Sequence, residues 1–520
     1  MNTGPAPRGV LRAGEEPVRT GFHAGQEPGA DLTSVLRVLA PGTGSGARNA
    51  LSPLHLAFAV IGAAFLWVAC TPVDDVDSVW HVRVGREILA RHTLHGLGTS
   101  WLAVRPPSGW LTSQWASEVS MSLIVTAGGW RALIAARLAL LVAILAGLAV
   151  TLLRGRPALL AVPVAALTAF VVLPSAQDRP QTVSLLFLAA LGPLAVRLWT
   201  SGERPPLMVI AIGSLLWAQF HGLWILAPAA FLLVAVGKVL DGARWPDPGL
   251  RDCLRVLGCS LAGVINPHGI GSFLLPLQLS VSTAHIAEWQ PTTLASPYTV
   301  ALATLIGLHV TAWARSGVRV PRSELMWVAC WTAFALLALR NLAPAALMIA
   351  PATLAAMDRT WGATIRESSA RTSVRERRVL SGLILATVAA GLIVAAGRVA
   401  RLDPLSDLPA RSIGQWVGRQ GHPLRIFNAY NAASGLIEFG KGNPRLIVDG
   451  RADLWGEAYV SRIIQAENLG PGWQQTLDNF RPEAIVLPRT APLTQLLLQQ
   501  GSWRLEIADS GYVLLVPDVE

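Results

Sequence analysis

Long apolar runs separated by short polar loops dominate the chain between residues 53 and 397. A helix needs about 20 apolar residues to cross a bilayer, and about 11 runs approach or reach that length. We expect spans at 53–71, 130–153, 157–176, 182–199, 206–220, 222–239, 253–266, 296–314, 324–339, 342–357 and 379–397. The pattern predicts a mainly α, polytopic helical membrane protein of about 11 spans.

The pattern changes at both ends of this region. Residues 1–50 are rich in Gly, Pro, Ala and Arg and lack apolar periodicity, so we expect a disordered tail. Beyond residue 399, short buried strands alternate with helical apolar spacing, which indicates a small α/β domain over 399–520. The expected strands are 425–430, 444–451, 483–489 and 512–518, and the expected helices are 458–469 and 493–501.

Composition supports the membrane assignment. Of the 520 residues, 52% are hydrophobic and only 14% are charged, whereas soluble domains carry about 25% charged residues. The 19 Trp residues against 4 Tyr fit many positions at a membrane interface. The four cysteines lie in or beside apolar runs without metal-ligand spacing, so we expect them to pack as small hydrophobic residues.

Basic residues are distributed unevenly between the loops. They occur in residues 1–50 and in the loops after the second, fourth, sixth, eighth and tenth spans, for example Arg154, Lys238 and Arg375. Cytoplasmic loops carry an excess of Lys and Arg. We therefore expect a cytoplasmic N-terminal tail and an extracytoplasmic C-terminal domain. The formal charge of +10 is then explained by topology, and no nucleic-acid partner is expected.

The loops on the opposite side hold nearly all the unusual polar residues of the membrane part. These loops are 72–118, 177–181, 221–222, 267–295 and 340–341. Because they meet at one face of the membrane, we expect the active cavity there.

Three carboxylates follow the first span, Asp74, Asp75 and Asp77, with His81 shortly after them. On a helix, Asp74, Asp77 and His81 would share one face. Asp is a favoured helix cap, so one of the three carboxylates, Asp74, Asp75 or Asp77, is expected to be only a cap. A carboxylate at a partly dry membrane face has a raised pKa and can accept a proton from a hydroxyl. His81 either holds a carboxylate, binds substrate or makes an interfacial hydrogen bond.

Arg179 and Arg340 stand at outer ends of spans. One explanation is that these side chains extend to the lipid headgroups, as many Arg residues at span ends do. Because Arg is disfavoured on the outer face, the alternative is that each binds a lipid-linked phosphate. An Asp449–Arg451 pair at a strand end is expected to be structural rather than a substrate contact. The other candidate substrate contacts are Asp74, Trp80, Trp115, Glu118, Gln181, His221, Asn266, His268, Glu288, Trp289 and Asn341. Turn chemistry and interfacial anchoring are the alternatives for the His and Trp residues.

The order of these motifs resembles a group of bacterial multi-spanning proteins described as glycosyltransferase-like, of the GT-C type. The resemblance covers nearly the whole chain after the tail. It differs at Val79, where the group often has Trp, and at Gln219, where it often has Asn. The motifs are D-x-D-x-x-W-H-x-x-x-G-x-x-I-L (75–89), W…Q-W…E (110–118), R-P-Q (179–181), W-x-Q-x-H-G (217–222), N-P-H-G (266–269), E-W-Q-P (288–291), R-N (340–341) and F-N…G…D-G-R-x-D (427–453).

This resemblance implies a GT-C-like membrane domain over 51–398 in the cytoplasmic (inner) membrane. Such enzymes transfer a sugar from a polyprenyl-phosphate donor to an acceptor outside the membrane, here an envelope glycan, lipid or protein. The role of catalytic base carries over to Asp75 or Asp77. Arg179 or Arg340 would stabilise the departing phosphate. A divalent cation, Mg²⁺ or Mn²⁺, bridging Asp and phosphate is left open by the sequence.

Two other functions compete with the glycosyltransferase. A non-catalytic carrier of lipid-linked glycans would be expected to show repeat-related halves and charges at mid-membrane, and the sequence shows neither. An envelope assembly protein would use the C-terminal domain as a binding module. Substitution of Asp75 and Asp77 by Asn distinguishes catalysis from assembly.

Overall fold

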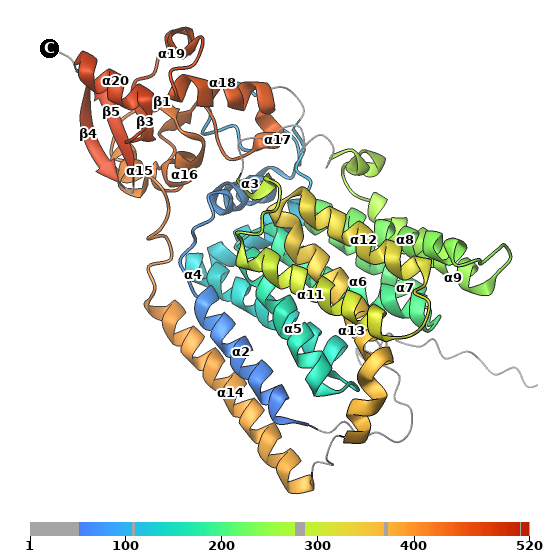
Figure 1. Ribbon diagram of the computed structural model, residues 1–520. Helices are drawn as coiled ribbons and strands as arrows, with labels where there is room; N and C mark the ends of the chain where they lie inside the picture. The colour runs from blue at the N-terminus through green and yellow to red at the C-terminus, as the bar shows by residue number, and fades with distance from the viewer. Residues whose placement is uncertain (1–50, 107–109, 276–286, 369–372, 510, 519–520) are drawn as a thin grey trace, which may run out of the picture.

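A computed structural model describes residues 51–106, 110–275, 287–368, 373–509 and 511–518. It has a large helical bundle and a small C-terminal domain that sits over one end of the bundle (Figure 1). The predicted disordered tail, residues 1–50, lies outside the described residues. The expected fold class, a polytopic helical membrane protein with a small C-terminal α/β domain, is confirmed.

Helical segments occupy every predicted span. Among the described residues, seven helical segments are long and apolar enough to cross a membrane, while Pro53–Ala69 and Leu207–Phe220 are apolar but shorter. The helices are α2 (Pro53–Ala69), α3 (Asp77–Arg91), α4 (Trp115–Leu148), α5 (Ala158–Val172), α6 (Pro180–Thr200), α7 (Leu207–Phe220), α8 (Leu226–Leu240), α9 (Pro248–Ser260), α11 (Pro297–Arg315), α12 (Arg322–Leu337), α13 (Leu342–Ser368) and α14 (Val374–Arg401).

Helix α13 forms the centre of the bundle. Its apolar side is rich in alanine, and residues such as Ala345, Ala346 and Ala350 are fully buried. Small side chains let neighbouring helices approach closely, and Gly192 of α6 lies directly against the backbone of Leu347. By contrast, α14 runs along the outside of the bundle beside α2 (Figure 1).

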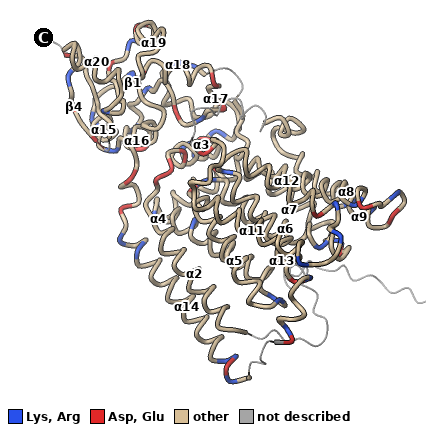
Figure 2. Tube along the Cα trace, in the orientation of Figure 1, with Lys and Arg blue, Asp and Glu red and all other residues tan. Residues whose placement is uncertain are grey.

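Charged side chains lie mostly at the ends of the bundle and in the C-terminal domain, and the middle of the bundle is largely uncharged (Figure 2). This distribution is the one expected for helices surrounded by lipid, because a charge at the bilayer centre is costly. The multi-pass membrane assignment therefore agrees between sequence pattern and structure.

Helix α4 begins earlier than predicted. The expected span started at residue 130, but helical structure begins at Trp115 and is interrupted at Gly128 and Gly129, where the backbone leaves helical geometry. Gly129 has a φ of 70°, a value that favours glycine. The kink joins a polar first half, which carries Glu118, to the apolar half that matches the predicted span.

The C-terminal domain contains one five-stranded sheet in the order β2-β1-β3-β5-β4. The first three strands are parallel, β5 pairs antiparallel with β3, and β4 pairs antiparallel with β5. The four predicted strands are present, whereas β4 was not predicted. The elements are α15 (Arg411–Val417), β1 (Leu424–Asn428), α16 (Ala433–Phe439), β2 (Pro444–Leu446), α17 (Ala452–Trp455), α18 (Glu457–Glu467), α19 (Trp473–Phe480), β3 (Ala484–Pro488), α20 (Pro492–Gln500), β4 (Trp503–Asp509) and β5 (Tyr512–Pro517).

The outer loop after α3 adds to the edge of this sheet. Leu102 pairs in parallel with Leu446 of the edge strand β2. The amide of Ala103 donates to the Leu446 carbonyl at 2.8 Å, and the Leu446 amide donates to Trp101 at 2.8 Å. An edge strand offers unpaired backbone groups, so this pairing fixes the C-terminal domain to one end of the bundle.

Helix α3 lies between the bundle and the C-terminal domain (Figure 1). Val79, Val84 and Ile88 of this helix are buried, whereas Leu89 is 40% exposed. Arg83 donates to Glu438 of α16 at 3.4 Å, because the C-terminal domain covers this side of the helix.

Candidate functional site

Arg179 joins two of the predicted carboxylates. It caps the start of α6, where Pro180 takes the first helical position. Its guanidinium pairs directly with Asp75 and lies 3.2 Å from the carboxylate of Asp77. It also donates to Glu288 at 2.8 Å. Residues from three separate predicted outer loops therefore meet at this one cation.

Asp75 and Asp77 have different environments. The Asp75 side chain is fully buried, and it accepts a hydrogen bond of 2.8 Å from the Asp77 amide. An Asp side chain typically makes this bond to the backbone amide two residues further on, and here it precedes the start of α3. The Asp77 side chain remains 22% exposed, so only Asp77 of this pair has a carboxylate open to a ligand.

The pKa of Asp77 is strongly perturbed. Burial raises it to about 7, and repulsion from Glu288, Asp449 and Asp453 acts in the same direction. A hydrogen bond of 3.0 Å from the Trp80 indole opposes this shift by stabilising the ionised form. A carboxylate with a pKa near neutral pH is suited to general base catalysis.

A second arginine extends the cluster. The Arg340 guanidinium donates to Gln181 at 3.1 Å and lies 3.5 Å from Glu288. It stacks over the Trp289 ring at 4.4 Å. Glu288 thus bridges Arg340 and Arg179, and these contacts hold two guanidinium groups at the same end of the bundle.

His81 faces Glu118 rather than the acidic pair. Its Nδ1 lies 3.4 Å from the Glu118 carboxylate, and both side chains are buried. Burial lowers the pKa of His81 to about 3, so its ring is neutral at physiological pH. The expectation that Asp74, Asp77 and His81 share a helical face is wrong for Asp74, because the helix begins only at Asp77 and Asp74 is exposed before it.

Trp115 and His221 lie where α4, α6 and α7 meet. The Trp115 indole donates to Gln219 at 3.1 Å. The His221 ring lies 3.0 Å from the Ser184 hydroxyl and accepts from the Leu223 amide at 3.3 Å. This second contact is the turn chemistry considered as the alternative for His221.

Asn266, His268 and Asn341 make local contacts. Asn266 bonds to Gly263 and to the His268 amide within one turn. Asn341 donates to the Phe334 carbonyl at 2.9 Å. Within the described ranges, none of the three contacts the carboxylates around Arg179.

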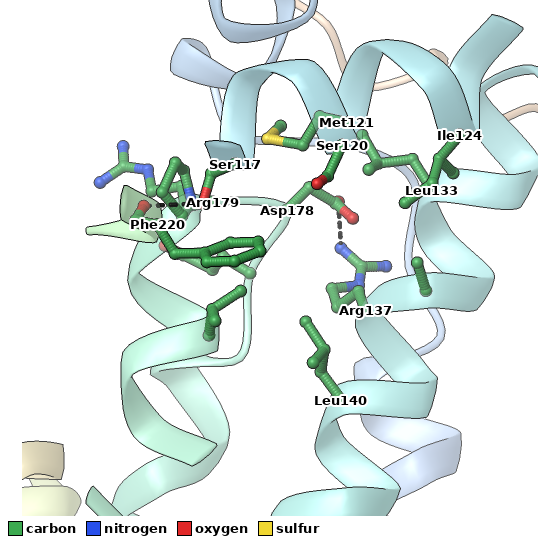
Figure 3. A pocket seen from close by; sticks show the side chains of 14 residues that line it. Ser117, Ser120, Met121, Ile124, Leu133, Arg137, Leu140, Asp178, Arg179 and Phe220 are labelled. Carbon is green, nitrogen blue, oxygen red and sulfur yellow. Dashed lines mark hydrogen bonds and ion pairs between the residues drawn. The ribbon is translucent and has the colours of Figure 1, made fainter. Parts of the chain in front are cut away.

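An apolar pocket opens between α4 and α6, next to Arg179. Its walls include Met121, Ile124, Leu133 and Leu140. In Figure 3 the Arg179 guanidinium points away from this pocket, toward the carboxylates with which it pairs. The main chain around Arg179 therefore lies between a pocket with mainly apolar walls, which also contains Arg137 and Asp178, and the cluster of carboxylates.

A buried ion pair in this pocket was missed from the sequence. Arg137 donates to Asp178 at 2.7 Å (Figure 3). It also donates to the Thr71 carbonyl at 2.6 Å. Burial raises the pKa of Asp178 to about 6 against the opposing effect of Arg137. Arg137, a charged residue inside the predicted span 130–153, could have revealed this pair from the sequence, because a charge within a span needs a partner.

The carboxylates around Arg179 are paired with its guanidinium. Among the described residues, no three His, Cys, Asp or Glu side chains are arranged to hold a metal ion. Asp75, Asp77 and Glu288 instead share Arg179. Since their donor oxygens face a guanidinium, these residues do not fit a bridging divalent cation, and we derive no step through one.

Comparisons with known proteins found likeness only among solved structures. No protein-family model matches the chain, and no curated protein sequence matches it. An oligosaccharyltransferase of Archaeoglobus fulgidus, tethered to an acceptor peptide, is similar with a TM-score of 0.46 and 11% identity, over 89% of this chain and 74% of that one.

ArnT from Cupriavidus metallidurans is similar in two structures. The apo structure has a TM-score of 0.49 and 13% identity, over 88% of this chain and 97% of that one. The structure bound to undecaprenyl phosphate has a TM-score of 0.46 and 14% identity, over the same shares. At these identities the likeness concerns the fold alone, and the argument for function depends on the site described above.

Proposed function

We propose that the chain is an integral-membrane glycosyltransferase that takes a sugar from a polyprenyl-phosphate donor and acts on the outer face of the cytoplasmic membrane. The observation that supports this most strongly is the position of Arg179. It lies between an apolar pocket and a pair of carboxylates, one of which has a pKa near 7. A polyprenyl-phosphate sugar has matching parts in the same order: an apolar chain for the pocket, a phosphate for Arg179, and a sugar near the carboxylates.

The pocket between α4 and α6 suits the apolar chain of the donor. Its wall side chains are aliphatic at Ile124, Leu133 and Leu140, and burial of apolar surface there contributes about 25 cal/mol per Å². The phosphate would then reach Arg179 and Arg340. A guanidinium matches phosphate geometry with paired hydrogen bonds, and displacement of Glu288 would free donors on both arginines.

Asp77 is the proposed general base. In the transfer step it accepts the proton of an acceptor hydroxyl, whose oxygen forms a bond to the anomeric carbon of the donor. The bond between that carbon and the phosphate oxygen breaks, and the phosphate leaves with the electron pair, stabilised by Arg179 and Arg340. General base catalysis of this kind contributes about 10²–10⁴-fold. Asp75 holds Arg179 and the start of α3 in place.

Envelope glycan and lipid profiling of a deletion strain complemented with variants tests this proposal. Asp77→Asn should fail to restore the glycan that the deletion strain lacks and should accumulate a polyprenyl-linked sugar, because the base is lost while the Arg179 site is kept. Asp478→Asn, which changes an exposed carboxylate on α19, is the matched control and should restore the glycan. An unchanged glycan profile in the deletion strain and in both variants would favour an envelope assembly protein instead.

A further inference from the structure

Residues 448–453, Val448 to Asp453, belong to the C-terminal domain and meet the candidate site at Gly450, and we call them the roof segment. They follow strand β2 and lead into α17. From the sequence, the Asp449–Arg451 pair within them was expected to be only structural. The geometry around Gly450 gives the segment a second role.

Gly450 lies directly against the candidate base. A side chain at this position would collide with the Asp77 carboxylate and would lie 3.2 Å from the Trp80 indole nitrogen. No residue larger than glycine therefore fits between the roof segment and α3 without movement of one of them. The Gly450 carbonyl accepts a hydrogen bond of 2.5 Å from Tyr430, which fixes its position.

Arg451 fastens the roof segment to the outer loop. Its side chain is fully buried and pairs with Asp449 at 2.6 Å. It also donates to the carbonyls of Leu97 and Gly98, at 3.2 and 2.5 Å. Gly98 has a φ of 66°, and a side chain there would collide with the Arg451 guanidinium.

Four tryptophans complete this fastening. The indoles of Trp101 and Trp455 each donate to Asp449 at 2.9 Å. Trp110 donates to Asp453 at 2.8 Å and packs edge-on against Trp80, with ring centroids 6.3 Å apart. Arg451 lies over the Trp101 and Trp110 rings, at 5.3 and 4.9 Å. The roof segment is thus bonded through Trp101 and Trp110 to the loop that follows α3.

We propose that the roof segment is a positioning element of the active site: Gly450 packs against Asp77, and Arg451 holds that contact closed through Asp449 and the outer loop. This inference rests on the proposed role of Asp77 and assigns the C-terminal domain a share in the chemistry. The domain is then part of the transferase site rather than a separate binding module.

The charges around Asp77 give the expected direction of a change. Arg179 and Asp75 face it from the bundle, Glu288 and Arg340 from the outer loops, and Asp449 and Asp453 from the roof segment. Burial and the two roof carboxylates raise the pKa of Asp77, while the Trp80 bond comes from its own helix. Loosening the roof segment weakens the burial of Asp77 and the repulsion from Asp449 and Asp453, which raise its pKa, and it also moves the Arg451 cation away. Because burial is the largest of these effects, we expect the pKa of Asp77 to fall.

The test uses the full chain in lipid nanodiscs and a double variant, Asp449→Asn with Arg451→Met. This pair removes the fastening without leaving a buried unpaired charge. A water-soluble carbodiimide with glycine ethyl ester labels protonated carboxyls, and peptide mass spectrometry follows labelling at residue 77 against pH. The midpoint should fall by about one unit or more, and sugar transfer should decrease at every pH. Arg425→Met is the matched control, because Arg425 packs on Phe480 in the same domain and its loss should change neither readout.

A double variant whose labelling midpoint stays at the wild-type value overturns the proposal, because a purely structural pair would lower only the amount of folded protein. The labelling does not require turnover. If Asp77→Asn retains full transfer while the midpoint still falls in the double variant, the positioning inference stands and the assigned base is wrong. If Asp77→Asn is inactive and the midpoint is unmoved, the assigned base stands and the roof segment has no positioning role.

Discussion

Trp80→Phe should move the acid limb of the activity profile to higher pH. The substitution keeps an aromatic ring but removes the indole N–H that donates to Asp77 at 3.0 Å. A hydrogen bond to a charged group contributes about 1.5–3 kcal/mol. Since one pKa unit corresponds to about 1.4 kcal/mol, the pKa of Asp77 should rise by roughly 1–2 units above its value of about 7.

The sign follows from the form of Asp77 that reacts. A general base must be ionised, so activity falls as the pH drops through the pKa. About half of the Asp77 carboxyls are ionised at pH 7 in the wild type. With a pKa roughly 1–2 units higher, about 1–10% remain ionised, and transfer at pH 7 should fall roughly 5- to 50-fold. At a pH well above the new pKa, the rate should return toward the wild-type value.

Sugar transfer would be measured in membrane vesicles between roughly pH 5 and pH 10, a range that extends well to either side of this pKa. The rise in the pKa of Asp77 would appear as a movement of the acid limb to higher pH. Labelling of residue 77 by carbodiimide over the same range reports the pKa without turnover. Trp473→Phe, on α19 of the C-terminal domain, is the matched tryptophan control and should leave both curves in place. A Trp80→Phe midpoint at or below the wild-type value would refute the assignment of Asp77 as the titrating base.

Two further predictions concern the frame around the site. Arg137→Met should destabilise the protein by about 3–5 kcal/mol, because it leaves the buried Asp178 unpaired. The double variant with Asp178→Asn should recover most of the loss of apparent Tm. A single variant as stable as the wild type would contradict this prediction. Gly85→Val should lower the apparent Tm in detergent, because a side chain there collides with the Glu118 backbone where α3 crosses α4. Gly382→Val, at an open position on α14, should leave the Tm unchanged. Equal Tm values for the two variants would disprove the close-packing argument.

The sequence alone determined the arrangement of spans and the general place of the site. Apolar run length is a local property, so each predicted span coincides with a helical segment, even where the segment is short, as at 207–220. The uneven distribution of polar residues pointed to a larger group that includes Asp75, Asp77, Arg179, Glu288 and Arg340. The structure places these five in contact through Arg179 and Glu288, whereas Asn266, His268 and Asn341 make local contacts instead.

Only the tertiary structure decided which carboxylate is open and what surrounds it. The sequence left Asp75 and Asp77 equivalent, because capping and exposure depend on where the helix begins and on which cation each residue meets. Gly450 and Asp77 are separated by more than 300 residues in the chain, and their contact depends on the outer loop that joins the sheet edge at Leu446. Contacts between distant segments follow from packing of whole elements, which no local pattern of residues encodes.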